Sequence, residues 1–102
     1  MAGSYIMTPK LAAETLQSIL DIRRDVREKT QMQLDALNIG ANALEKAAET
    51  DPGLTQKAHI MRYHAGNKGA YMFQDDFTRG ALKAAVSCIK KDAARYGGGE
   101  YE

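Results

Sequence analysis

The chain has 102 residues, of which 44% are apolar, a formal net charge of +1 and a single cysteine, Cys88. This length predicts one domain with a modest core, and the apolar share excludes global disorder. The near-neutral charge argues against strong nucleic-acid binding, no apolar run is long enough to cross a membrane, and residues 1–4 lack the character of a secretory signal. Because one cysteine cannot form an internal disulfide, we expect a reducing, cytoplasmic location.

The first expected element is one long helix over residues 9–49. Thr8 can cap it, and Pro9 suits its first position because the amide there needs no partner. An apolar stripe follows in which ten steps cover 36 residues, a mean of 3.6, which is the period of a straight α-helix. The stripe comprises Ala12, Leu16, Ile19, Ile22, Val26, Thr30, Leu34, Leu37, Ala41, Leu44 and Ala48.

Two details qualify this long helix. Asp25 and Lys29 are spaced to form an ion pair across one turn, which adds a few tenths of a kcal/mol. Gly40 is a weak point, because glycine inside a helix costs about 1 kcal/mol relative to alanine.

The clearest break in the helical pattern is the sequence Asp51-Pro52-Gly53. Aspartate caps helices well and proline is tolerated in the first turn, so these residues predict the start of a second helix over residues 52–65. Gly66 is a natural C-cap for it.

A third helix is expected over residues 70–96, followed by a flexible glycine-rich tail over residues 97–102. A single helix across both segments is the alternative, since two interior glycines would cost only about 2 kcal/mol together. We favour a break at Gly66–Gly69. The buried face of the third helix is expected to comprise Phe73, Phe77, Ala81, Leu82, Ala85, Val86, Ile89 and Ala93.

These elements predict an all-α fold, either an antiparallel helical hairpin or a three-helix bundle, in one domain over residues 1–96. The apolar stripe on the long first helix is longer than two partner helices are expected to cover. We therefore expect the chain to associate with itself as a dimer or a higher oligomer.

Polar and glycine residues are concentrated in one short segment, Arg62-Tyr63-His64-Ala65-Gly66-Asn67-Lys68-Gly69. The simplest interpretation is that these residues form an ordinary helix end, in which case the chain binds another protein or itself. If the segment is a site, its candidate contact residues are Arg62, Tyr63, His64, Asn67 and Lys68.

A second interpretation is a site for a small anionic ligand. A glycine break before a helix exposes backbone amides at the positive end of the helix dipole. Arg62 with Lys68 can clamp a phosphate, while Tyr63 or Tyr71 can stack on a base. The loose pattern Arg62-Tyr-x-Ala-x-x-Lys68 resembles small helical phage proteins that sequester cyclic nucleotides, which implies a nucleotide-like signal held without chemistry.

A third interpretation concerns residues 51–70. They contain an acidic cap, an alanine–histidine pair, an aliphatic residue, a cation, a small residue and a glycine–alanine pair. This order resembles the histidine-phosphotransfer domain, a four-helix bundle. The resemblance implies that His59 carries a phosphoryl group and that Arg62 steadies it. The chain departs from the family at Tyr63, where the family has a glycine.

A weaker resemblance is to the secreted helical hairpins of type VII systems, which are about this long. His64-Ala65-Gly66 can stand for their Trp-x-Gly motif. The residues from Tyr96 to Glu100 match their export signal, a tyrosine followed by three residues and an acid. This resemblance implies a secreted helical-hairpin protein.

Other chemistry has little support in the sequence. His59 and His64 are five residues apart, whereas two histidines that share a metal on a helix are four apart. No serine–histidine–acid set is present. We therefore expect a non-catalytic binding protein of a phage or bacterial accessory type, without cofactor or metal. Its expected partners are a second copy, another protein or a small anionic ligand, without strong nucleic-acid binding and without a membrane.

Overall fold

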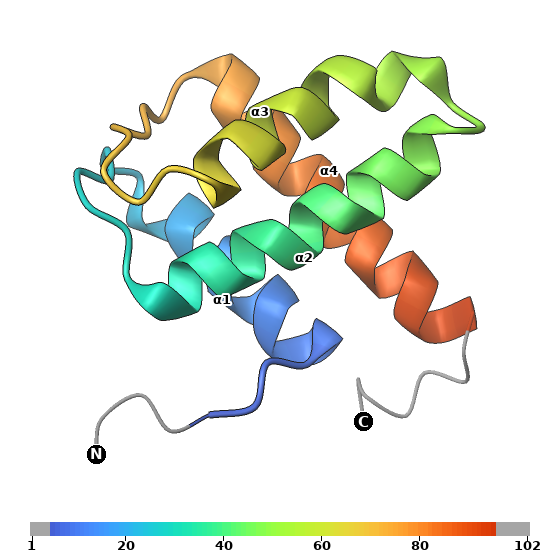
Figure 1. Cartoon of the computed structure of the whole chain (residues 1–102), viewed down its shortest axis with the longest axis horizontal. Helices are drawn as coiled ribbons and strands as arrows, with labels where there is room; N and C mark the ends of the chain where they lie inside the picture. Colours follow the sequence, from blue (N-terminus) through green and yellow to red (C-terminus); the bar gives the residue numbers. More distant parts are fainter. Residues whose placement is uncertain (1–4, 96–102) are drawn as a thin grey trace.

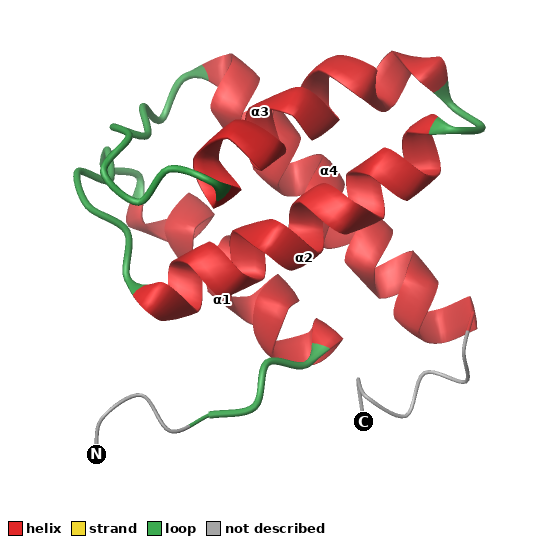
Figure 2. Ribbon diagram, viewed as in Figure 1, coloured by secondary structure: helices red, strands yellow, loops and turns green. Residues whose placement is uncertain are grey.

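The computed structural model describes the backbone of residues 5–95 and the side chains of residues 5–92. Within these limits the chain is built from helices joined by loops (Figures 1 and 2). The elements are α1 (Pro9–Ile22), α2 (Gln31–Ala48), the short 3-10 turn η1 (Pro52–Leu54), α3 (Thr55–Ala65) and α4 (Asp76–Arg95). The predicted all-α fold class is confirmed.

The predicted long helix over residues 9–49 is wrong, because the chain leaves the helix at Arg23. Arg23 ends α1 in the left-handed conformation, with φ 58°. Thr30 then begins α2 with a capping box, in which its hydroxyl accepts from the Gln33 amide and the Gln33 side chain accepts from the Thr30 amide. The reversal between them lets the two halves of the apolar stripe pack against each other, so the bundle has four helices.

The predicted turn after α2 is confirmed. The Asp51 carboxylate accepts a hydrogen bond from the Gly53 amide at 3.1 Å, and Pro52 opens η1. At the far end of α3 the chain breaks at Gly66, as expected, and Gly66 is the C-cap residue. Its φ of −94° lies in the right-handed region, so the cap makes no use of the left-handed freedom of glycine.

Helix α4 begins later than the predicted residue 70, because residues 66–75 form a loop. The Asp75 carboxylate accepts from the Thr78 amide at 2.8 Å and thereby caps the first turn. Phe73 and Phe77, which were expected in the core, are 56% and 73% exposed, so that prediction is wrong. The other members of the predicted face within the described side chains are buried, namely Ala81, Leu82, Ala85, Val86 and Ile89. The predicted position of Ala93 in the core and the predicted tail lie outside the residues whose side chains are described.

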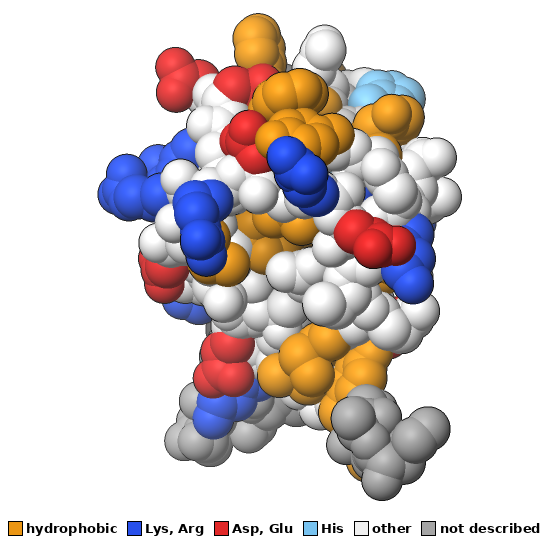
Figure 3. Space-filling view, turned by 90° about the vertical axis from the view of Figure 1, so that its left-hand side faces the viewer, with side chains coloured by type: hydrophobic (Ala, Val, Ile, Leu, Met, Phe, Trp, Pro, Cys, Tyr) orange, Lys and Arg blue, Asp and Glu red, His pale blue; other side chains and the backbone are white. Residues whose placement is uncertain are grey.

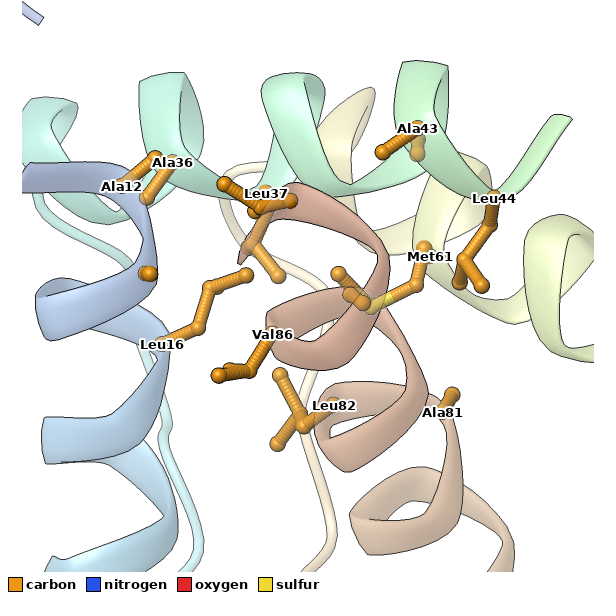
Figure 4. Close-up of a cluster of buried hydrophobic side chains, with 14 of the residues drawn as sticks. Ala12, Leu16, Ala36, Leu37, Ala43, Leu44, Met61, Ala81, Leu82 and Val86 are labelled. Carbon is orange, nitrogen blue, oxygen red and sulfur yellow. The ribbon is translucent and has the colours of Figure 1, made fainter. Parts of the chain in front are cut away.

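The core lies where α2 crosses the other helices. Side chains of α1, α2 and α4 point towards one another there, and Met61 of α3 reaches the same cluster (Figure 4). Leu16 on α1, Leu37 on α2 and Leu82 on α4 are fully buried. The chain thus buries most of its own apolar stripe, with Ile22 left 41% exposed, so most of the surface that the sequence offered for self-association is taken up by the fold.

The two long loops lie at the same end of the bundle, on the left in Figure 1. Val26 and Met72 exchange two backbone hydrogen bonds of 2.9 Å, and the Lys29 amide donates to the Lys68 carbonyl at 3.1 Å. We call this region, residues 23–30 together with residues 66–75, the loop end.

Candidate functional site

Arg62 is directed from α3 across to α2. Its Nε and Nη2 donate to the two carboxylate oxygens of Glu45, both at 2.9 Å. Its Nη1 and Nη2 also donate to the side-chain oxygens of Asn38 at 2.6 Å and Asn42 at 2.5 Å. The hydrogen bonds between the two side chains raise the pKa of Arg62 and lower the pKa of the Glu45 carboxyl. Four of its five N–H donors are therefore engaged in joining two helices, which leaves little for a ligand.

His64 points the other way, into the protein, and is 6% exposed. Its Nδ1 is buried without a hydrogen-bond partner. Burial above all, together with the positive charge of Lys29, lowers the pKa of His64 to about 4, while Asp75 acts in the opposite direction. The imidazole is accordingly neutral at pH 7 and packs its ring edge against Tyr63, with the ring centres 5.1 Å apart.

The remaining members of the predicted site do not converge. Asn67 folds back, and its amide donates to the Tyr63 carbonyl at 2.6 Å, which satisfies an acceptor at the end of α3. The Tyr63 ring is 58% exposed, and Lys68 is exposed as well. The five predicted residues are thus neighbours in sequence that perform different tasks: Tyr63, Asn67 and Lys68 are exposed, Arg62 is engaged with α2, and His64 is buried.

Lys29 is the residue that sequence reasoning placed wrongly. It was expected to pair with Asp25 across one helical turn, but the loop directs it inward, where it is 1% exposed. Its ammonium donates to the carbonyl of Asn67 at 2.8 Å and to that of Ala70 at 2.6 Å. Burial lowers the pKa of this ammonium. Asp25 instead accepts a hydrogen bond from the Gln74 amide at 2.8 Å. Lys29 and Asp25 therefore each connect the two loops.

The surface of the loop end is rich in exposed aromatic rings. Tyr71 and Phe73 are 41% and 56% exposed, and their ring centres are 4.6 Å apart. Phe77, the second residue of α4, is 73% exposed and lines an open groove with Ile60 of α3. Figure 3 shows hydrophobic side chains gathered on this face of the molecule, with Lys and Arg side chains beside them. The aromatic residues Phe73 and Phe77 are visible in the sequence, where their spacing predicts a place in the core, but in the structure both are exposed.

The same end carries an open hollow of about 700 Å³ between the α1–α2 loop and Tyr71. Three arginines line it, Arg23, Arg24 and Arg27, together with the first turn of α2. In the part of the chain that the structure describes, none of the three has an acidic partner. This basic hollow lies outside the segment that the sequence singled out.

The other predicted chemical groups are placed as follows. His59 is exposed on α3 and close enough to Glu45 for its charge to lower the pKa of that carboxyl. Burial raises the pKa of the Cys88 thiol, which disfavours the reactive thiolate. Among the described residues, no group of three histidine, cysteine or acidic side chains is placed to hold a metal ion. The proposed export signal at residues 96–100 lies outside the described residues.

Comparison with known proteins identifies no relative. No family model matches the chain, and no curated protein or solved structure matches it. None of the helices within the described residues combines the length and the apolar character needed to cross a bilayer.

Proposed function

We propose that the chain is a non-catalytic binding protein whose loop end docks against a protein surface, with a second copy of the chain as its first candidate partner. The proposal is carried by one observation: Tyr71 and Phe73 are exposed with their ring centres 4.6 Å apart, and Phe77, four residues further along the chain, is exposed as well. Aromatic side chains exposed as a group mark contact surfaces, because burying them on binding removes a large apolar area from water.

Two further features support docking at this end. Tyr63, near the end of α3, is a further exposed ring, and Lys68 is an exposed cation of the loop end. The backbone that carries Tyr71 and Phe73 is also held in place, because the Lys29 ammonium and the Val26–Met72 bridge fix this loop by hydrogen bonds. A supported apolar surface loses little conformational entropy on binding.

The histidine-phosphocarrier alternative is less well supported. Within the described residues the protein has four α-helices, and His59 is exposed, as a phosphocarrier requires. Arg62, however, is held by Glu45 and two asparagines of α2, and the nearby Glu45 carboxylate would repel a phosphoryl group on His59. The observed contacts therefore favour a docking protein over a carrier.

Measuring the mass of the protein in solution over a hundredfold concentration range tests the proposal. We expect the parent chain to associate as concentration rises, and the Phe73→Ser/Phe77→Ser double variant to stay monomeric, because two exposed rings are lost from the contact. Ile6→Ser is the matched control, since Ile6 is 84% exposed but precedes α1, away from the loop end. Ile6→Ser should associate like the parent.

If the parent chain is monomeric throughout, the second copy is excluded as partner. A photo-crosslinking amino acid placed at position 73 then tests for another protein in cells, with the same probe at position 6 as control. Equal crosslinking from both positions would contradict a docking role for the loop end.

A further inference from the structure

The arginines of the loop end lie on the loop between α1 and α2, whereas its exposed aromatic rings lie on the loop between α3 and α4. Arg23, Arg24 and Arg27 fall within five consecutive residues of the α1–α2 loop and border one hollow. Asp25 and Glu28 also line it, but Asp25 already accepts a hydrogen bond from the Gln74 amide. Three cations thus face two carboxylates, one of which is engaged, so the hollow attracts anions.

The first turn of α2 forms another wall of the hollow, through Thr30 and Gln33. Their side chains are engaged with each other's amides in the capping box. The first intrahelical hydrogen bond runs from the Leu34 amide to the Thr30 carbonyl, so the amides of Gln31 and Met32 precede it. These amides and the helix dipole add positive potential to that of the arginines.

Tyr71 supplies an aromatic wall on the opposite loop. Its ring is 41% exposed and is supported by Phe73, whose ring centre is 4.6 Å away. The hollow measures about 700 Å³, which is within the range of roughly 300–1,000 Å³ typical of small-molecule sites. Cations from one loop and an aromatic ring from the other loop, both lining one hollow, suit a ligand that is charged at one end and flat at the other.

We propose that this hollow binds a mononucleotide, with its phosphate held by Arg24 and Arg27 and its base against Tyr71. The guanidinium fork matches phosphate oxygens in pairs, and the tyrosine ring accepts the flat face of any base. This site shares Tyr71 with the docking surface, whereas Arg24 and Arg27 belong to the hollow alone and Phe77 to the docking surface alone. Arg23, whose backbone is left-handed at the end of α1, also borders the hollow.

Calorimetric titration of the whole chain with ATP and with cyclic AMP tests the site. We expect one of these nucleotides to bind, and adenosine and inorganic phosphate each to bind at least about tenfold more weakly, because each offers half of the recognised chemistry. Arg24→Ala and Arg27→Ala should each weaken nucleotide binding about tenfold through the loss of a charged hydrogen bond. Tyr71→Leu should weaken binding of the nucleotide but not of inorganic phosphate.

Lys83→Ala is the matched control, since Lys83 is an exposed cation on α4 that does not line the hollow. It should bind the nucleotide as the parent does, and so should Phe77→Ser, which separates this site from the docking surface. The inference is overturned if neither nucleotide binds at millimolar concentration or if the arginine variants bind like the parent. It is also overturned if inorganic phosphate binds as tightly as the nucleotide, which would mean general attraction of anions.

Discussion

The centre of α2 and the loop end differ in how their backbone is held. At the centre, helices approach so closely that a Cβ atom on Gly40 would lie 2.7 Å from Met61 Cε and 3.1 Å from both Ala85 Cβ and Leu16 Cδ1. At the loop end there is no such crossing, and hydrogen bonds from Lys29 hold two loops together beneath exposed rings. The comparison shows which side chains are available to a partner. Around Gly40 the side chains pack against one another in the core, whereas many side chains of the loop end are exposed.

The largest effect is expected from removing the tie at the loop end. Lys29→Ala should lower the free energy of unfolding by about 3 kcal/mol, because two loop carbonyls lose a charged donor and the buried stem is lost. Lys29→Met keeps most of the stem and should lose somewhat less. Urea denaturation measures both, and amide exchange over residues 66–71 should speed up.

Lys68→Ala is the control for this prediction, since Lys68 is an exposed lysine of the same end, and its effect should stay within about 0.5 kcal/mol. A Lys29→Met variant as stable as the parent would show that the ammonium does not hold the loops.

A pair of glycines tests the packing at the centre of α2. Gly40→Ala should destabilise the protein by about 2 kcal/mol despite the better helix propensity of alanine, because the new methyl group overlaps three side chains. Gly80→Ala on α4 should instead stabilise it by about 0.5–1 kcal/mol, since the nearest neighbour, Lys57 Cε, is 3.7 Å from the added Cβ. Thermal or urea melts of both variants measure the contrast, and a stabilised Gly40→Ala would sink it.

The third effect concerns His64. The pKa of His64 is lowered from its ordinary value of 6.5 to about 4 in the folded protein, so between these two values the unfolded chain binds more protons. Stability should therefore fall as the pH drops through this window, by up to about 2 kcal/mol between pH 7 and pH 5, at 1.36 kcal/mol for each unit of pKa.

His64→Leu should remove this pH dependence, whereas His59→Gln should retain it because His59 is exposed. Urea titrations at the two pH values provide the measurement. An unchanged slope in His64→Leu would mean that another group titrates there. At lower pH Asp75 should add to the loss, since hydrogen bonds from Thr78 lower the pKa of its carboxyl.

Part of the site was open to prediction from the sequence. Arg62 lies eleven residues after Asp51, and the residues that recur along one face of α2, Asn38, Asn42 and Glu45, lie thirteen, nine and six residues before it. An antiparallel hairpin folded at that turn places Arg62 opposite this face, so its engagement with α2 was predictable. The break before α2 also had a signal, the threonine and glutamine of the capping box, but the apolar period outweighed it.

The sequence by itself determined the helical class, the turn after α2, the end of α3 and most of the core face of α4, because each depends on local backbone preferences and on apolar spacing. Only the tertiary structure decided that the first stripe folds back at Arg23, since Val26 and Thr30 keep the helical period through a loop. It alone decided that Lys29 is buried and that Arg23, Arg24 and Arg27 face water. Those outcomes depend on contacts between residues about 20 to 50 positions apart, such as Lys29 with Asn67 and Asp25 with Gln74, and no local pattern encodes them.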